Sequence, residues 1–251
     1  MLMTHAISRV TLVLLAAGAV CAQAPDARPA FEAASVKLNT TGSGSASSNS
    51  TKGQIVIVNQ PLKRLIERAY SVKPFQVSGP EWMENVRFDI VAKYPPDTKN
   101  ADRPAMLRTL LEDRFKLSTH GESKEMPGYA LVVTKGGLKL KPVDSGGGSG
   151  TSSNSNNNLE TLKVTTISMA ELADFLARRV GSAVADSTGV AGVFTFELQW
   201  TREDPNGESA TAGEFANIQE ALSTIGLRLQ AQKVPVQMVV VDHVERVATE
   251  N

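Results

Sequence analysis

The apolar residues of this chain fall into two successive series of strand-like and helix-like segments. The first series begins with an alternating segment at 54–58. Pro61 then opens a helix whose apolar residues recur at the i, i+3, i+4 and i+7 spacing. The remaining predicted elements of this series are a strand over 87–93, a helix around 106–111 and two strands over 115–120 and 128–133.

The second series repeats these signals in the same order. A strand over 162–166 is followed by Ser168, with Glu171 three residues later, which is the capping-box spacing at the start of a helix. The remaining predicted elements are a strand over 194–200, a helix over 215–225 that Gly226 ends, and two strands over 227–232 and 234–241. In the strand over 194–200 the large apolar residues alternate, which predicts that they face the core.

Matching positions in the two series are separated by a nearly constant number of residues. Phe88 and Phe196 lie 108 residues apart, and so do Pro127 and Pro235. We therefore predict an α+β fold built by tandem duplication of a small β-α-β-α-β-β module, with the helices packed on short mixed or antiparallel sheets. Chance agreement between two unrelated α+β patterns is the alternative.

Two polar low-complexity tracts, over 39–53 and 144–158, each precede one series. Their Ser, Gly, Asn and Thr residues bury little apolar surface, so they are typical of flexible loops or linkers. The predicted organisation is a signal peptide over 1–22, an N-terminal segment with a Ser/Gly-rich loop over 23–53, a first α+β repeat over 54–142, a flexible Ser/Gly/Asn linker over 143–158 and a second α+β repeat over 159–251.

The first residues have the pattern of a secretory signal peptide. Arg9 precedes an apolar run over 10–20, and small residues follow it. The run is shorter than the ~20 residues of a membrane-spanning helix, so we expect no stable membrane span. Cleavage is expected after Ala22, giving a periplasmic or extracellular protein. Val20 stands where a lipid-modified cysteine is usually preceded by Gly, Ala or Ser, so we do not expect Cys21 to carry a lipid.

Cleavage at that point would remove the only cysteine of the chain, leaving no disulfide and no thiolate ligand or nucleophile. The 26 basic and 26 acidic residues balance overall, but they are distributed unevenly. Residues 52–142 contain 16 Lys and Arg against 10 Asp and Glu, whereas residues 159–251 contain 7 against 13. These halves could attract each other or present different faces to partners. The basic charges are scattered and aromatic residues are few, so no nucleic-acid partner is expected.

Five blocks of sequence carry a resemblance to a known family. They are "FEAASVK" (31–37), "VSGPEWMENVRFDIVAK" (77–93), "LLEDRFKLSTHGESKEMPGYALVVTKGGLKLKP" (110–142), "SMAELADFLARRVGSAVADSTGVAGVFTFELQW" (168–200) and "VVVDHVER" (239–246). In this order they resemble the soil-associated family of secreted bacterial proteins, which has no established activity. Related domains are attached to membrane-bound peptidases of the antibiotic-sensor type, which implies an extracytoplasmic sensing or interaction role. The repeat also resembles, more loosely, the short N-terminal domain of secretins and TonB-dependent receptors, a protein-interaction module.

Candidate chemistry in the exported part of the chain is sparse. Its two histidines, His120 and His243, each follow a strand-like segment without the spacing of a metal site. Asp242 could orient an imidazole, but adjacent strand residues point to opposite faces, so it should not reach His243. Glu122 near His120 could form an acid/base pair, although the segment containing both more simply forms a charged hairpin edge. No serine lies in a nucleophile or phosphate-loop motif.

Trp82 lies in a predicted turn, where an exposed indole would be a contact residue and a folded-back indole would be structural. The binding candidates are therefore Trp82, His120, Glu122 and His243, with no catalytic residue, metal or cofactor expected. The favoured hypothesis is a non-enzymatic interaction or sensing module for an envelope protein or a cell-wall polymer, of open oligomeric state. The alternatives are an extracytoplasmic enzyme of unrecognised type, most simply a hydrolase, and a peptidase-associated regulatory or inhibitory domain.

Overall fold

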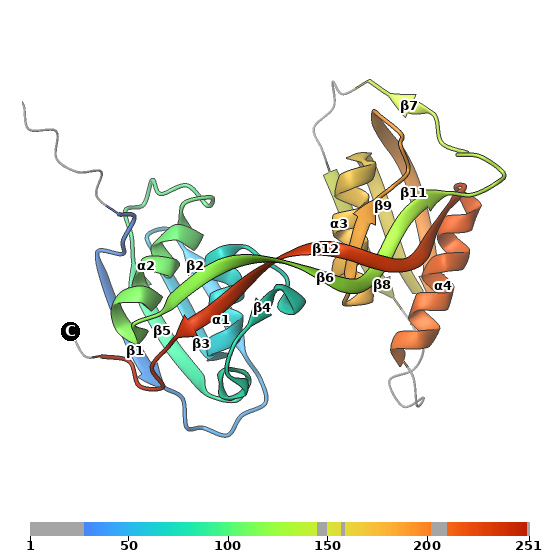
Figure 1. The fold of residues 1–251 in the computed structure, drawn as a ribbon. Helices are drawn as coiled ribbons and strands as arrows, with labels where there is room; N and C mark the ends of the chain where they lie inside the picture. Colours follow the sequence, from blue (N-terminus) through green and yellow to red (C-terminus); the bar gives the residue numbers. More distant parts are fainter. Residues whose placement is uncertain (1–27, 145–149, 157–158, 202–209, 250–251) are drawn as a thin grey trace, which may run out of the picture.

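The computed structural model describes residues 28–144, 150–156, 159–201 and 210–249 of the chain. The predicted signal peptide lies outside these residues. Two lobes lie at opposite ends of a long antiparallel ribbon formed by β6 (Ser118–Val133) and β12 (Leu227–His243) (Figure 1). Both strands run the full length of the ribbon, so each contributes to both lobes.

The first lobe is a four-stranded antiparallel sheet, in the order β1-β5-β3-β2, with two helices on its inner face. The strands are β1 (Ala33–Leu38), β2 (Ser47–Thr51), β3 (Gln54–Pro61) and β5 (Arg87–Lys93), and the helices are α1 (Leu62–Tyr70) and α2 (Arg103–Phe115). The short strand β4 (Val77–Ser78) pairs in parallel with β12, between the 3-10 turns η1 (Pro74–Gln76) and η2 (Glu81–Glu84). Residues of both helices and the sheet form one apolar core, in which Phe88 and Phe115 meet edge to face at 4.8 Å.

The second lobe has the same arrangement. Its sheet has the order β7-β11-β9-β8, and β10 pairs in parallel with β6. The strands are β7 (Pro142–Val143), β8 (Gly150–Asn156), β9 (Leu159–Ser168), β10 (Ala183–Asp186) and β11 (Val193–Thr201), and the helices are α3 (Met169–Val180) and α4 (Ala210–Thr224). As the alternation predicts, Phe194, Phe196, Leu198 and Trp200 of β11 are buried in the core of this lobe.

The α+β class is confirmed, and the two sheets match strand for strand when six is added to each strand number. The ribbon is centred on the pair Met126 and Val234, and Pro127 and Pro235 each follow one member of that pair. Such a matched order is what a duplicated module requires of its topology. The duplication itself stays a prediction.

The prediction of two short strands at the end of each series was wrong. Residues 115–120 and 128–133 were expected to be separate strands joined by a charged hairpin edge, but the intervening polar segment is the middle of β6. It pairs with residues 234–239 of β12, which alternate between buried and exposed positions. A partner more than 100 residues away thus provides the backbone hydrogen bonds that a local turn was expected to provide.

The low-complexity tracts also differ from the predicted loops. Part of each tract forms a strand, β2 in the first and β8 in the second, at one edge of its sheet. Edge strands need no buried side chains when a neighbour supplies the backbone hydrogen bonds, and β2 is exposed throughout. Consequently the N-terminal segment belongs to the first lobe's sheet, while residues 127–133 of the predicted first repeat belong to the second lobe.

A small apolar cluster fills the junction between the lobes. Val234, Val236 and Met238 of β12 are buried there with Ala183 of β10, and Phe75 of η1 packs against them. Elements of both lobes therefore share this cluster, which holds the ribbon against each of them.

Candidate functional site

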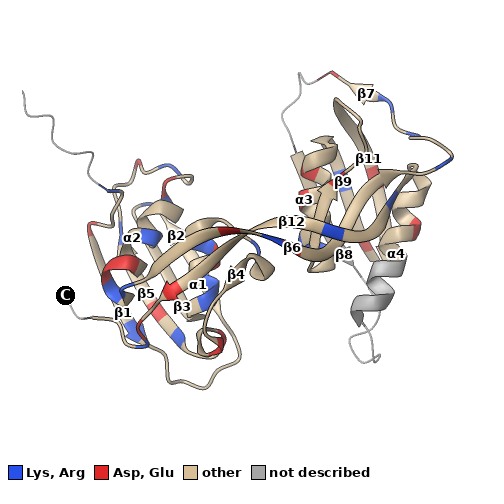
Figure 2. Cartoon of the chain, viewed as in Figure 1, with Lys and Arg blue, Asp and Glu red and all other residues tan. Residues whose placement is uncertain are grey.

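A polar cleft of about 700 Å³ lies where the α1 end of the first lobe faces α3 of the second lobe. Its charged side chains are mostly basic, and Figure 2 shows the basic positions on α1. Its lining residues are Gln60, Arg64, Glu67, Arg68, Ser71, Val72, Lys73, Pro74, Asp174 and Arg178. The charged residues of this lining are four cations and two carboxylates, which leaves an excess of positive charge.

Both carboxylates of the cleft are already paired. Asp174 on α3 contacts Lys73 of the first lobe and forms an ion pair with the guanidinium of Arg178, with 2.8 Å between nitrogen and oxygen. Glu67 is almost fully buried and accepts a hydrogen bond of 2.7 Å from Arg64. The contact between Lys73 and Asp174 joins the two lobes across the cleft.

Arg68 is the cation of the cleft lining that takes part in none of these pairs. In the described part of the chain, its guanidinium has no hydrogen-bonding or ion-pair partner. Partial burial and, to a lesser extent, the positive charge of Arg64 lower the pKa of Arg68 below its ordinary value. The cleft therefore holds a half-buried positive charge without an anion beside it, which is an environment that an anionic ligand would improve.

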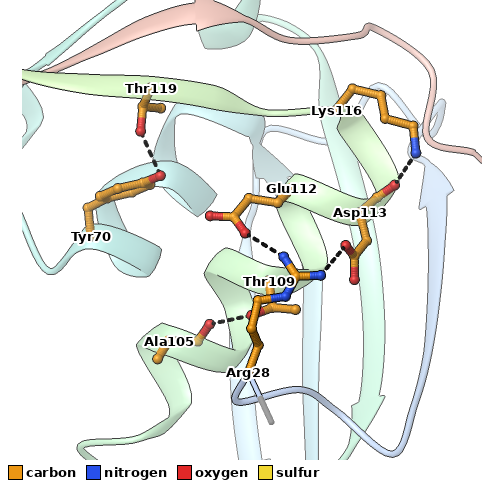
Figure 3. Close-up of polar contacts among 8 residues, drawn as sticks. All are labelled: Arg28, Tyr70, Ala105, Thr109, Glu112, Asp113, Lys116 and Thr119. Carbon is orange, nitrogen blue, oxygen red and sulfur yellow. Dashed lines mark hydrogen bonds and ion pairs between the residues drawn. The ribbon is translucent and has the colours of Figure 1, made fainter. Parts of the chain in front are cut away.

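Contacts with the rest of the first lobe fix the position of α1. The Tyr70 hydroxyl lies 2.8 Å from the Thr119 hydroxyl of β6 (Figure 3). The guanidinium of Arg108 on α2 lies 4.2 Å from the centre of the Tyr70 ring. The helix follows Pro61 directly and ends at Ser71 in the left-handed conformation, with φ of 54°. These contacts hold the arginines of α1 on the side that faces α3.

The helix α3 begins at the capping box predicted from the sequence. The Ser168 hydroxyl accepts a hydrogen bond from the Glu171 amide, and the Glu171 carboxylate accepts one from the Ser168 amide. The Ser168 amide and, to a lesser extent, the Ser168 hydroxyl donate to the Glu171 carboxylate and so lower the pKa of that carboxyl. The cap fixes the first turn of α3, and Asp174 and Arg178 follow one and two turns later.

Of the residues proposed from the sequence, His120 makes the most specific contact. Its Nδ1 lies 2.7 Å from a carboxylate oxygen of Asp242 on β12, and both side chains are about half exposed. His120 pairs with Val240, and Asp242 lies two residues further along β12, next to a bulge between Val241 and His243, so its side chain falls on the same face as His120. The sequence raised Asp242 as a partner only for His243, because the pairing of β6 with β12 was not foreseen.

The other candidates are dispersed. His243 is exposed opposite Ser118, two residues from His120 along β6, and Glu122 is exposed opposite Met238 on the ribbon. Trp82 lies in η2, half-buried against the first lobe's core, with the guanidinium of Arg246 at 5.2 Å from its ring. None of the four candidates lines the cleft or three further cavities of the described residues.

Residues 63–244 match the model of a protein family of unknown function, DUF3738. The chain belongs to this family. No curated protein and no solved structure matches it. Every residue that lines the cleft falls inside the DUF3738 range except Gln60.

The described ranges of this DUF3738 protein contain no helix that is long and apolar enough to cross a membrane. In the same ranges, no three or more His, Cys, Asp or Glu side chains come together as a metal site would require.

Sequence reasoning missed the cleft. Its signal was the segment "LKRLIERAY" (62–70), in which Arg64 and Arg68 lie one helical turn apart and therefore on the same face. The prediction from this segment used only the spacing of its apolar residues, which places the apolar face of the helix, and left the two arginines aside. The opposing wall could not be inferred, because it depends on how the ribbon places α3.

Proposed function

We propose that this protein is an exported binding module that takes an anionic ligand in the cleft between α1 and α3. Its placement outside the cytoplasm rests on the predicted signal peptide and on the resemblance to soil-associated secreted proteins. The looser resemblance to the short N-terminal domain of secretins and TonB-dependent receptors agrees with a role in binding. Such a module would serve to sense a ligand in the cell envelope.

One observation carries the proposal: the charge of the cleft is uncompensated at Arg68. Both carboxylates of the cleft are already ion-paired, Asp174 with two cations and Glu67 with Arg64. A guanidinium pairs best with planar or tetrahedral oxyanions, because its N–H groups can donate to two oxygens at once. A ligand with carboxylate or phosphate groups would meet Arg68 from the open side of the cleft.

The geometry favours binding over the hydrolase alternative. The pair of His120 and Asp242 is the arrangement that a general base would need, since the carboxylate can orient the imidazole. It lies, however, on an exposed part of the ribbon and lines neither the cleft nor three other cavities of the described residues. Catalytic groups usually act inside a concave site that excludes water.

Calorimetric titration with citrate and with inorganic phosphate tests the proposal. We expect citrate to bind, and to bind more weakly as salt is added, because ions screen interactions between exposed charges. Arg68→Met and Arg178→Gln should each weaken binding by about tenfold or more, since a hydrogen bond to a charged group contributes roughly 1.5–3 kcal/mol.

Arg228→Gln is the matched control. Arg228 is exposed on β12, contacts Gln230 and lies outside the cleft lining. Citrate should bind this variant as it binds the unmodified protein. Absence of binding to the unmodified protein, or an equal loss in the Arg228 variant, would contradict a specific anion site.

A further inference from the structure

A second, smaller cavity lies within the first lobe next to the cleft. Its volume is about 180 Å³, and it lies between the inner face of the sheet and the start of α2. The lining is Phe31, Ser50, Ile55, Ile57, Arg68, Ile90, Asn100, Arg103, Pro104 and Leu107. Six of these side chains are apolar, two are arginines and none is a carboxylate.

Neither arginine of this cavity has its side-chain donors fully paired with hydrogen-bond acceptors among the described residues. Arg103 stacks over the Tyr94 ring at 4.9 Å, and its Nε is buried with no hydrogen-bonding partner in the described chain. Arg68, which is unpaired among the described residues, lines both this cavity and the cleft. An apolar wall with two unneutralised cations is complementary to a molecule that is apolar at one end and anionic at the other.

We infer that the ligand is a carboxylic acid with one short hydrocarbon or aromatic group, held with its apolar group in this cavity and its carboxylate on Arg68. This inference rests on the proposed function, because it places the anion of the ligand at the cleft. The carboxylate lies where cavity and cleft meet, and Arg103 donates to it from the apolar side.

The size of the cavity sets the size of the apolar group. A dry cavity of about 150 Å³ lined by apolar side chains accommodates benzene. The cavity here is slightly larger, so it admits a phenyl ring or a branched chain of similar volume. Long-chain fatty acids exceed it. The ligand class is therefore small aromatic and short aliphatic acids.

Titration of the full chain with benzoate, acetate, benzamide and citrate separates this inference from the proposed function. Benzoate tests acid and ring together, acetate the acid alone, benzamide the ring without charge, and citrate the cleft. Benzoate should bind at least about tenfold more tightly than acetate, because even one methylene in an apolar pocket is worth roughly tenfold or more. It should also bind at least about tenfold more tightly than benzamide, through its charged hydrogen bonds to Arg68.

Two variants fill the cavity from different sides. Leu107→Phe acts from α2, and Ser50→Phe acts from an exposed position on the edge strand β2, where it does not perturb the core. Each should remove the advantage of benzoate over acetate and leave citrate binding within about twofold of the unmodified protein. The Ser50 variant keeps the test valid if the Leu107 variant does not fold.

The outcomes are distinct. If citrate binds but benzoate binds no better than acetate, the inference is overturned while the proposed anion site stands. If benzoate keeps its advantage in a folded Ser50→Phe protein, its ring binds elsewhere and the inference is overturned. If none of the acids binds, the inference and the proposed function fail together.

Discussion

At the scale of single residues, Arg68 is kept at a cost to stability. Its pKa is lowered in the folded protein, so the charged form that exists at neutral pH is less favourable there than in the unfolded chain. Solvent screens a half-exposed group, so the cost is a fraction of a kcal/mol. We predict that Arg68→Met, which keeps the aliphatic stem, leaves the melting temperature unchanged or slightly higher. Thermal unfolding followed by circular dichroism measures this.

The matched control for Arg68 is its neighbour Arg64, one turn earlier on the same helix. Arg64 pairs with Glu67, which is almost fully buried, so Arg64→Met would leave a buried carboxylate without its cation. We expect a loss of about 1–3 kcal/mol in the free energy of unfolding, as for a buried polar group deprived of its partner. A larger loss for the Arg68 variant than for the Arg64 variant would contradict this account of Arg68.

The sequence predicted residues well where their role depends on local spacing. The alternation in 194–200 placed Trp200 in the core, and the spacing of Ser168 and Glu171 placed the start of α3. It failed for the contact of His120 with Asp242, because those residues are 122 positions apart in the chain. The charge of Arg68 was visible, but its lack of a partner among the described residues depends on tertiary packing.

At the scale of elements, the ribbon of β6 and β12 was the largest departure from the prediction. Each strand contains a polar middle segment that looks like a break when it is read alone. In β6 this segment, over 120–125, is exposed throughout, yet its backbone is paired along its whole length. Side-chain patterns report burial, whereas backbone pairing depends on where a partner strand lies. The same reasoning applies to β2 and β8 in the low-complexity tracts.

Gly128 of β6 pairs with Ala183 at the start of β10, where the two backbones leave no room for a side chain. A Cβ atom at this position would lie 2.6 Å from the Ala183 carbonyl oxygen and 2.7 Å from Val234 Cγ2. We predict that Gly128→Ala pushes β10 away from the ribbon and lowers the free energy of unfolding by about 1–3 kcal/mol, the usual range for overpacking. Urea titration measures the loss.

Gly121 on the same strand is the control for Gly128. A Cβ atom there would meet no atom within 4 Å, so Gly121→Ala should be tolerated without loss of stability. Equal destabilisation by the two variants would indicate a general sensitivity of the strand to side chains and would contradict the role given to the contact with Ala183.

At the scale of the whole molecule, each lobe is completed by the other half of the chain. The C-terminal part of β12 joins the first lobe, where Val241 is buried in its core, and the C-terminal part of β6 joins the second, where Leu131 is buried. The opposite charges of the two sequence halves are therefore distributed over both lobes. Strand pairing along the ribbon and shared apolar contacts join the halves over a much longer stretch than the ion pair of Lys73 with Asp174 does.

This exchange of strands predicts how the protein responds to division of the chain between Lys141 and Pro142. Neither 28–141 nor 142–251 contains a complete lobe, so we expect each fragment alone to lack a cooperative unfolding transition. Produced together, they should form a 1:1 complex that survives 1 M salt, at which the screening length falls to about 3 Å. Size-exclusion chromatography with light scattering measures the complex. A fragment that folds alone as a monomer, or a complex that salt dissociates, would mean that the halves are self-contained modules joined by charge.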